Sequence, residues 1–174
     1  EETSDFYNNG MKSWVKEVIG RPFDNLNRFH ALYLLRIRDF DSYFPVETLG
    51  EKLSRTFGGI GFDIMGRSDI SIDMESYAAK NPDAVCIGIE IPGDIHVLVK
   101  PVGGLIDMET LLHEVGHAFY ISHFDSNLPL EYRRLYRSTA LDEAFAFLFM
   151  ELIENPLWAR SVAGLEATEA ARLA

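Results

Sequence analysis

The most restrictive feature of this sequence is the segment LLHEVGHAFY, residues 111–120, in which two histidines stand four residues apart. Its apolar residues recur at helical spacing, so the segment predicts a helix packed against a core. Four-residue spacing places His113 and His117 on one face of that helix, with Cβ atoms roughly 5–6 Å apart. Buried polar groups need partners. The segment therefore predicts either two hydrogen-bonded core histidines or two ligands of one metal ion.

Glu114 favours the metal ion. The 3.6-residue period rotates it about 100° from His113, so its carboxylate can reach a metal-bound water without binding the metal. This is the H-E-x-x-H pattern, in which two imidazoles bind zinc and the glutamate acts as general base. We therefore predict one Zn²⁺ per chain, with His113 and His117 as ligands and Glu114 as the catalytic residue.

A catalytic zinc ion usually has three protein ligands and one open position, and the first candidate for the third ligand is His123. It follows His117 by six residues, the spacing of a longer pattern in which a glycine turns the chain after the second histidine. Tyr120 stands at that glycine position. A continuing helix would carry His123 about 9 Å further along its axis, so we expect a histidine at the helix end and not a ligand.

The second candidate is Glu143, in the segment TALDEAFAFLFMEL. This helix is apolar nearly all round, which predicts burial, and a buried carboxylate must be paired or bound to a metal. Periodicity does not choose between Glu143 and its neighbour Asp142. An acid that offsets the helix dipole suits Asp142, which leaves Glu143 as the expected third ligand. Asp142 and Glu151 are both candidates for orienting the histidine ligands.

The remaining pattern predicts an α+β fold that is predominantly helical, with a small antiparallel sheet beside the histidine helix. The helices are expected at residues 5–19, 24–41, 46–57, 108–123 (capped by Asp107), 129–136, 138–154 and 157–172. A strand is expected at 68–76, and a hairpin at 84–91 and 94–100 around Pro92-Gly93. The edge of this hairpin either aligns an extended peptide by strand addition or is purely structural; the sequence leaves both open.

Composition excludes several partners. A formal net charge of -11 argues against nucleic acid and anionic membrane surfaces, and no apolar run approaches the ~20 residues that span a bilayer. The lone Cys86 forms no internal disulfide, so we expect a cytoplasmic location and no oxidising compartment. The 174 residues suit one domain. The sequence does not start with Met, and it ends within a helical pattern that has no stop signal, so we expect a piece of a longer chain. The sequence does not indicate an oligomeric state.

The segment HEVGHAFY, followed by Glu143 twenty-six residues after His117, resembles the gluzincin peptidases of the thimet oligopeptidase and oligoendopeptidase family. It is also similar to the carboxypeptidase Taq family, and the likeness covers roughly residues 69–158. The resemblance implies a zincin-like catalytic domain that holds zinc through His113, His117 and Glu143. It implies Glu114 as acid and base, and a peptide substrate held against the small sheet.

Two features depart from the family pattern. Tyr120 stands where thimet-type signatures often carry a third histidine. The family's oxyanion-stabilising Tyr and His come from a loop well beyond the glutamate ligand, and this sequence ends thirty-one residues after Glu143. The expected function is a zinc metallopeptidase acting on oligopeptides. The alternatives are a metallocarboxypeptidase of the carboxypeptidase Taq type and a non-catalytic zinc-binding fragment.

Overall fold

The computed structural model describes residues 2–27, 29–30, 37–135 and 138–174, and contacts divide the chain into two compact units, residues 1–39 and 40–174. The first unit contains helix α1 (Glu2–Ile19) and a 3₁₀ turn, η1 (Phe23–Asn25). The second contains the sheet and all the predicted site residues. The expectation of a single domain over residues 1–174 stays a prediction.

The helix predicted at 24–41 does not begin at residue 24: residues 23–25 form η1, and of the described residues in the predicted span 29–30 are α-helical. Leu26 is extended after η1, and the Oδ1 atom of Asn27 accepts hydrogen bonds from the backbone N–H groups of Phe29 and His30. These are the hydrogen bonds of a helix N-cap, and the helical residues 29–30 follow it. A 3₁₀ helix, η2 (Arg38–Tyr43), follows. Residues 28 and 31–36 of the predicted helix lie outside the described residues.

The core of the second unit forms where helix α3 meets helix α4 (Leu105–Ser122). Helix α3 (Val46–Gly58) starts after Pro45 and buries Leu49, Leu53 and Phe57 at four-residue spacing, which defines one apolar face. Phe57 stacks on Phe149 with ring centroids 4.5 Å apart. Phe119 of α4 contacts both rings, at 5.9 and 5.1 Å, so this packing joins α3, α4 and the helix that carries Phe149.

The sheet has three strands, β1 (Ile70–Asp73), β2 (Val85–Glu90) and β3 (Asp94–Leu98), in the order β1-β3-β2. The predicted hairpin is confirmed, because β2 and β3 pair antiparallel. The prediction of a purely antiparallel sheet is wrong, because β1 pairs parallel to β3. Alternation of apolar and polar residues identifies a strand but carries no information about its neighbour. Because β3 lies in the middle of the order β1-β3-β2, strand β2 is an edge strand.

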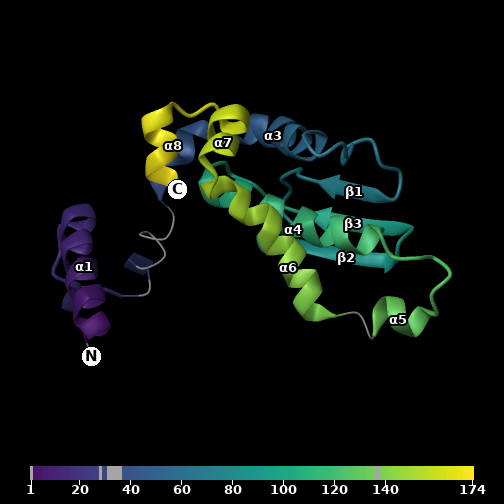
Figure 1. Ribbon diagram of the computed structural model, residues 1–174, viewed down its shortest axis with the longest axis horizontal. Coiled ribbons are helices and arrows are strands. Elements are labelled where there is room, and N and C mark those ends of the chain that lie inside the picture. The colour runs from purple at the N-terminus through teal and green to yellow at the C-terminus, as the bar shows by residue number, and fades with distance from the viewer. Residues whose placement is uncertain (1, 28, 31–36, 136–137) are drawn as a thin grey trace. The chain divides into compact units, whose positions relative to one another are not determined.

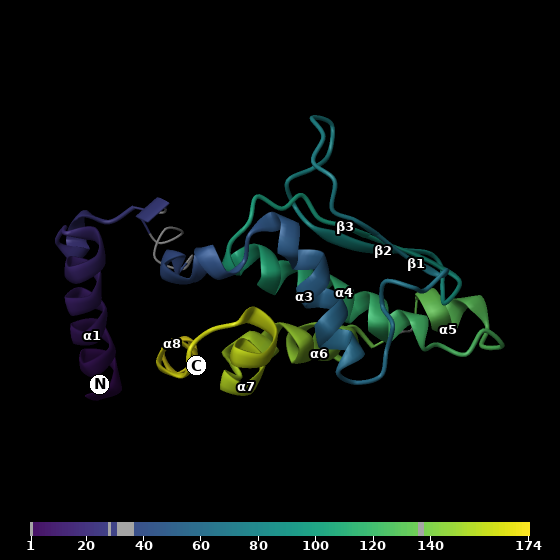
Figure 2. The ribbon, with the colours of Figure 1, turned by 90° about the horizontal axis from the view of Figure 1, so that it is seen from above.

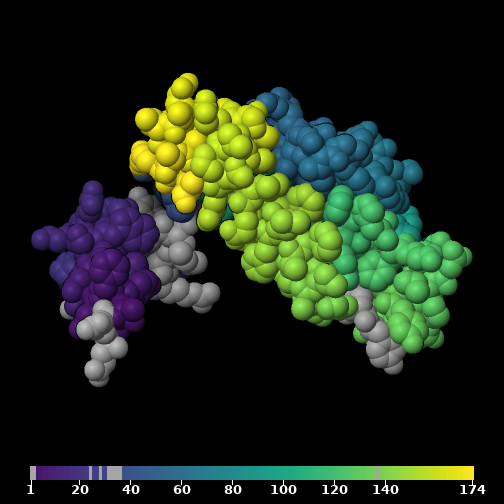
Figure 3. Space-filling view, viewed as in Figure 1, coloured from purple at the N-terminus to yellow at the C-terminus, as the bar shows by residue number. Residues whose placement is uncertain are grey.

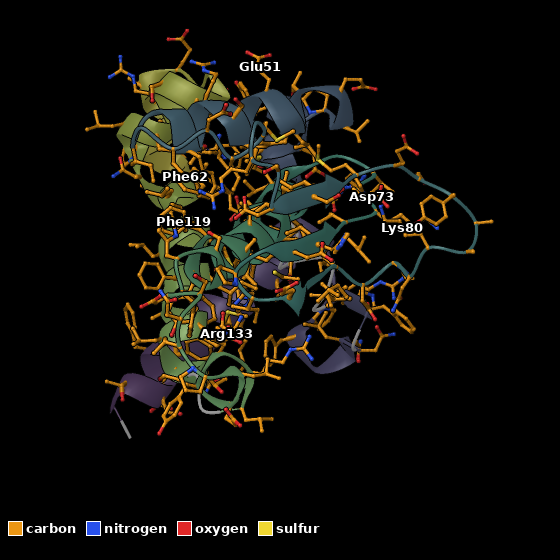
Figure 4. All side chains as sticks on the ribbon, turned by 90° about the vertical axis from the view of Figure 1, so that its right-hand side faces the viewer. Glu51, Phe62, Asp73, Lys80, Phe119 and Arg133 are labelled. Atoms are coloured by element: carbon orange, nitrogen blue, oxygen red, sulfur yellow. The ribbon has the colours of Figure 1, made fainter. Side chains whose placement is uncertain are left out.

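The loop between β1 and β2 is closed by Lys80, which is 7% exposed. Its Nζ lies 2.9 Å from Asp73 Oδ1 and donates to the backbone carbonyls of Asp73 and Glu75. Asp73 and Lys80 lie side by side at the base of this loop (Figure 4). The contact holds the loop and so positions residues 84–86, which begin β2.

Helix α4 (Leu105–Ser122) carries the histidines and starts three residues earlier than the sequence predicts. Asp107 is therefore not its cap but lies in the first turn, where Oδ2 accepts from the N–H groups of Val102 and Gly103 at 2.6 and 2.7 Å. Asp41 accepts the N–H of Leu105 instead, at 3.0 Å. An acid from a distant segment thus satisfies the helix start.

The C-terminal third is helical, as predicted, but more segmented. Its elements are α5 (Leu130–Arg134), α6 (Thr139–Met150), the 3₁₀ helix η3 (Glu151–Glu154), α7 (Pro156–Trp158), the π-helical η4 (Ala159–Ala163) and α8 (Ala167–Leu173). The single helix predicted at 157–172 is wrong, because Gly164 adopts a positive φ of 81° and ends η4.

The second unit is layered around α4. The sheet packs on one side of α4 and α6 on the other, as the views in Figure 1 and Figure 2 both show. The apolar composition of α6 predicts burial on all sides, and this prediction is wrong. Leu141, Phe147 and Leu148 are exposed, and α6 lies at the surface in Figure 3. Within the described residues, no helix combines the length and apolarity needed to cross a membrane.

Candidate metal centre

Three predicted ligands meet between α4 and α6. His113 Nε2 lies 3.2 Å from His117 Nε2, and Glu143 Oε2 lies 3.6 Å from the first and 3.9 Å from the second. The two histidines come from successive turns of α4, and Glu143 comes from the second turn of α6. These three residues form the one group of potential ligands found among the described residues that could hold a metal ion.

The spacing of the three donor atoms fits a tetrahedral ion. Bonds of ~2.0–2.1 Å to nitrogen or oxygen at tetrahedral angles place donor atoms about 3.3 Å apart. The observed separations of 3.2, 3.6 and 3.9 Å bracket that value from just below to slightly above. A side-chain adjustment of a few tenths of an ångström at Glu143 would complete the geometry, and its side chain is 46% exposed and has room to move.

His117 is held by a carboxylate. Its Nδ1 lies 2.7 Å from Asp142 Oδ1, and the Asp142 residue is only 5% exposed. Because a carboxylate accepts, Nδ1 carries the proton and Nε2 of the neutral ring keeps a lone pair toward His113 and Glu143. This hydrogen bond raises the pKa of His117, burial lowers it, and the charges of Asp142, Glu114 and Glu143 raise it further. Protons therefore compete with a cation for this ring.

His113 is held by packing. Its ring meets the Phe147 ring edge-on at 5.2 Å and the His117 ring at 4.8 Å. Its Nδ1 is buried and has no hydrogen-bond partner among the described residues. The two candidate ligands thus differ: an acid orients His117, and aromatic contacts orient His113.

Gly116 brings the two helices together at this point. A Cβ atom added there would lie 2.7 Å from the Cα of Ala146 and 2.8 Å from the carbonyl oxygen of Phe145. No real Cβ tolerates such contacts with backbone, so only glycine permits this approach of α4 and α6. The close approach is what allows Glu143 on α6 to reach both histidines on α4.

A cavity opens beside the triad. Its walls come from the start of β2, from α4 and from α6. The lining residues are Ala84, Val85, Cys86, Glu114, His117, Ile121, Thr139, Asp142 and Glu143. Glu114 thus lies in the same cavity as two of the three potential ligands. Among the described residues its carboxylate accepts no hydrogen bond, so its oxygens are available to a water or substrate.

Sequence reasoning brought together His113, His117, Glu114 and Glu143, and the structure places all four at this one location. It left the partner of His117 open between Asp142 and Glu151, and the structure selects Asp142. It placed the hairpin that contains residues 84–86 beside the site, but it gave no role to Ile121 and Thr139, which also line the cavity. The glycine inside an apolar helical pattern was an available signal for the close helix contact.

The remaining histidines lie elsewhere. His123 caps the end of α4, where its Nδ1 lies 2.6 Å from the Phe119 carbonyl and its ring packs against Phe119 and Phe62. Figure 4 shows those two phenylalanines together. His96 lies in β3 beside Asp94. Neither joins the group between α4 and α6.

Comparison with known proteins adds no relative, since no family model, no curated protein and no solved structure matches this chain. The class that the fold and the site define is accordingly a predominantly helical α+β protein with a potential three-ligand metal centre.

Proposed function

We propose that this chain is a zinc-dependent metallopeptidase that hydrolyses peptide bonds of oligopeptides. The observation that carries the proposal is the convergence of His113 Nε2, His117 Nε2 and Glu143 Oε2 within 3.9 Å of one another. Two imidazoles and one carboxylate are a donor set typical of catalytic zinc sites, and structural zinc sites are normally closed by four protein ligands. Among the described residues no fourth ligand joins the three.

Zinc held by three protein groups would lower the pKa of water at its open position toward ~7 and polarise a substrate carbonyl. Glu114 lies in the cavity beside His117 and Glu143, where its carboxylate would accept the proton of the attacking water. The same carboxyl group would then return that proton to the departing amine nitrogen. Asp142 would keep His117 in the tautomer that directs Nε2 to the ion.

The wall formed by β2 supports a peptide as the substrate class. Strand β2 is the sheet edge next to the cavity, and residues 84–86 line it. An extended peptide lying along this edge would place one of its carbonyls beside the triad. A hairpin with no part in substrate binding is the alternative, and the length dependence described below separates the two.

The first experiment compares Glu114→Gln with the wild-type chain on internally quenched peptides. We expect zinc content to stay at one ion per chain and kcat to fall by roughly 10²–10⁴-fold, since the general base is lost. Glu109→Gln, on the same helix, is the matched control and should keep its turnover. Unchanged turnover in Glu114→Gln would refute the assignment of Glu114.

A second measurement separates the candidate activities. Peptides with a free and with an amidated C-terminus are digested side by side and the products are identified by mass. An oligopeptidase cleaves both, whereas a carboxypeptidase fails on the amide because it requires the terminal carboxylate. Stoichiometric zinc binding without hydrolysis of any peptide would favour the non-catalytic alternative.

A further inference from the structure

Helix α5 is fastened across the far end of β2 by two arginines. Arg133 donates to the carbonyls of Ile91 and Leu128, the latter at 2.9 Å, and Arg134 donates to the carbonyls of Gly88, at 3.3 Å, and Ile89. Helix α5 has no buried residue. These hydrogen bonds, rather than apolar packing, therefore hold it. In Figure 4 Arg133 lies on α5, beyond the strands.

The Gly88 carbonyl lies on the outer edge of the sheet. In β3, Ile95 and Val99 donate their N–H groups toward β1 at 2.9 Å, so the alternate residues of β3 are the ones that bond to β2. Gly88 stands opposite Ile95, which turns its carbonyl away from β3. A strand added to this edge would need that carbonyl as an acceptor. Arg134 occupies it.

The occupied carbonyl lies close to the metal centre. Residues 84–86 line the cavity, and Gly88 follows Cys86 by two residues, about 7 Å at the rise of a strand. A Cβ atom at Gly88 would lie 3.3 Å from the Ile121 side chain, and Ile121 lines the same cavity. Strand β2 therefore begins at the cavity, and the Arg134 guanidinium contacts its edge further along the strand.

We infer that α5, held by Arg134, closes this end of the cleft and sets the length of peptide that fits on one side of the scissile bond. Arg134 is thus a specificity-determining residue; the inference rests on the proposed peptidase function. Antiparallel strand pairs outnumber parallel ones two- to threefold, so a bound peptide runs opposite to β2. Its residues beside Gly88 then precede the scissile bond, and about two residues fit there.

The test uses zinc-loaded protein and two series of peptide hydroxamates, whose hydroxamate group binds the metal and fixes the register. One series extends only toward the amino side of the metal, and the other only toward the carboxyl side. Calorimetry measures each Kd as residues are added one at a time. In the wild type we expect the amino-side series to stop gaining affinity after two residues and to lose at least tenfold at the fourth.

Arg134→Ala should remove that tenfold loss and leave the carboxyl-side series unchanged. Arg160→Ala, an exposed arginine of η4 remote from the cavity, is the matched control and should behave as wild type. Thermal unfolding verifies that each variant is folded, and Arg134→Gln provides a second removal of the guanidinium.

The inference is overturned if both series depend on length equally in the wild type, if the limit falls on the carboxyl side, or if both Arg134 variants keep the amino-side limit. Failure of every hydroxamate to bind zinc-loaded protein is a different result. It would refute the accessible catalytic metal centre and hence the proposed function itself.

Discussion

One face of α4 carries two very different clusters, one turn apart. Glu109, His113 and His117 follow at four-residue spacing and so lie on the same face. His113 and His117 converge with Glu143 at 3.2–3.9 Å. Glu109 instead feels the carboxylates of Glu151 and Glu154, whose charges, together with the larger effect of burial, raise its pKa to about 7.

The difference shows that the residue types in a cluster decide whether it binds a proton or a metal ion. Burial, and to a lesser extent the two neighbouring carboxylates, favour the protonated form of Glu109, which is why its pKa rises. Two imidazoles with one carboxylate offer lone pairs in the geometry of a tetrahedral ion, and Asp142 fixes the tautomer of one ring. The first cluster is suited to a proton and the second to a metal ion.

The largest effect should come from His113→Ala. Structural zinc sites release ~10–16 kcal/mol over four ligands, so one lost ligand should weaken zinc binding by about a hundredfold or more. Competition with a chromophoric chelator measures the change. Glu109→Ala, one turn earlier on the same helix face, should leave zinc affinity within about twofold. If both variants lost zinc affinity equally, the assignment of the metal ion to His113 and not to the cluster around Glu109 would be refuted.

Gly116→Ala should be next in size. The added Cβ would meet the Ala146 backbone at 2.7 Å, and overpacking of this kind costs ~1–3 kcal/mol. Denaturant unfolding should show that loss, and zinc affinity should fall as α6 moves away from α4. Gly58→Ala, in a helix with no atom within 4 Å of the new Cβ, is the control. A variant as stable as the control would show that the helices do not depend on this approach.

Asp142→Asn should weaken zinc binding without abolishing it. Loss of a carboxylate that orients a ligand histidine typically costs 10–100-fold in affinity, roughly 1.4–2.7 kcal/mol. The bond from His117 Nδ1 would then go to an amide oxygen in place of the carboxylate. If Asp142→Asn matched His113→Ala in size, Asp142 would be acting as a ligand and not as the orienting partner.

The smallest effect should be on stability, at Glu109. Its folded pKa of about 7 lies above the ordinary value of 4.5, so the folded state binds more protons than the unfolded state between these values. Stability should therefore fall as pH rises from 4.5 to 7 and then level off. Glu109→Gln should remove this slope and be more stable than wild type at pH 8, by about 1 kcal/mol.

Urea unfolding at pH 5 and pH 8 tests this prediction. Glu90→Gln, an exposed acid in β2, is the control and should keep the wild-type slope. A slope that survives in Glu109→Gln would mean that the carboxylates of η3, and not Glu109, take up the proton.

The candidate metal centre was largely readable from sequence because most of its residues are close together in the chain. His113, Glu114 and His117 lie within five residues of one helix, and helical geometry alone places both rings on one face. Glu143 required a long-range argument, namely that a carboxylate in a buried helix needs a partner. Its premise is wrong, because the Glu143 side chain is 46% exposed, although Glu143 does lie beside the two histidines. Zinc as the ion and peptide hydrolysis as the reaction stay predictions.

Features that depend on tertiary contacts were not readable. The parallel pairing of β1 with β3 leaves no trace in the alternating pattern of β1. Asp41, sixty-four residues before Leu105 in the chain, accepts the first N–H of α4, whereas local sequence predicts the nearer Asp107 as the cap. The apolar composition of α6 predicted full burial, yet Leu148 is 58% exposed, because α4 covers only one side of that helix.

The most direct test of the central claim is an anomalous difference map, recorded at the zinc edge, from crystals grown with stoichiometric Zn²⁺. The account predicts one strong peak, within bonding distance of His113 Nε2, His117 Nε2 and Glu143 Oε2, with a fourth position facing Glu114. A peak bound by a fourth protein ligand, or one that leaves Glu143 turned to solvent, would contradict it.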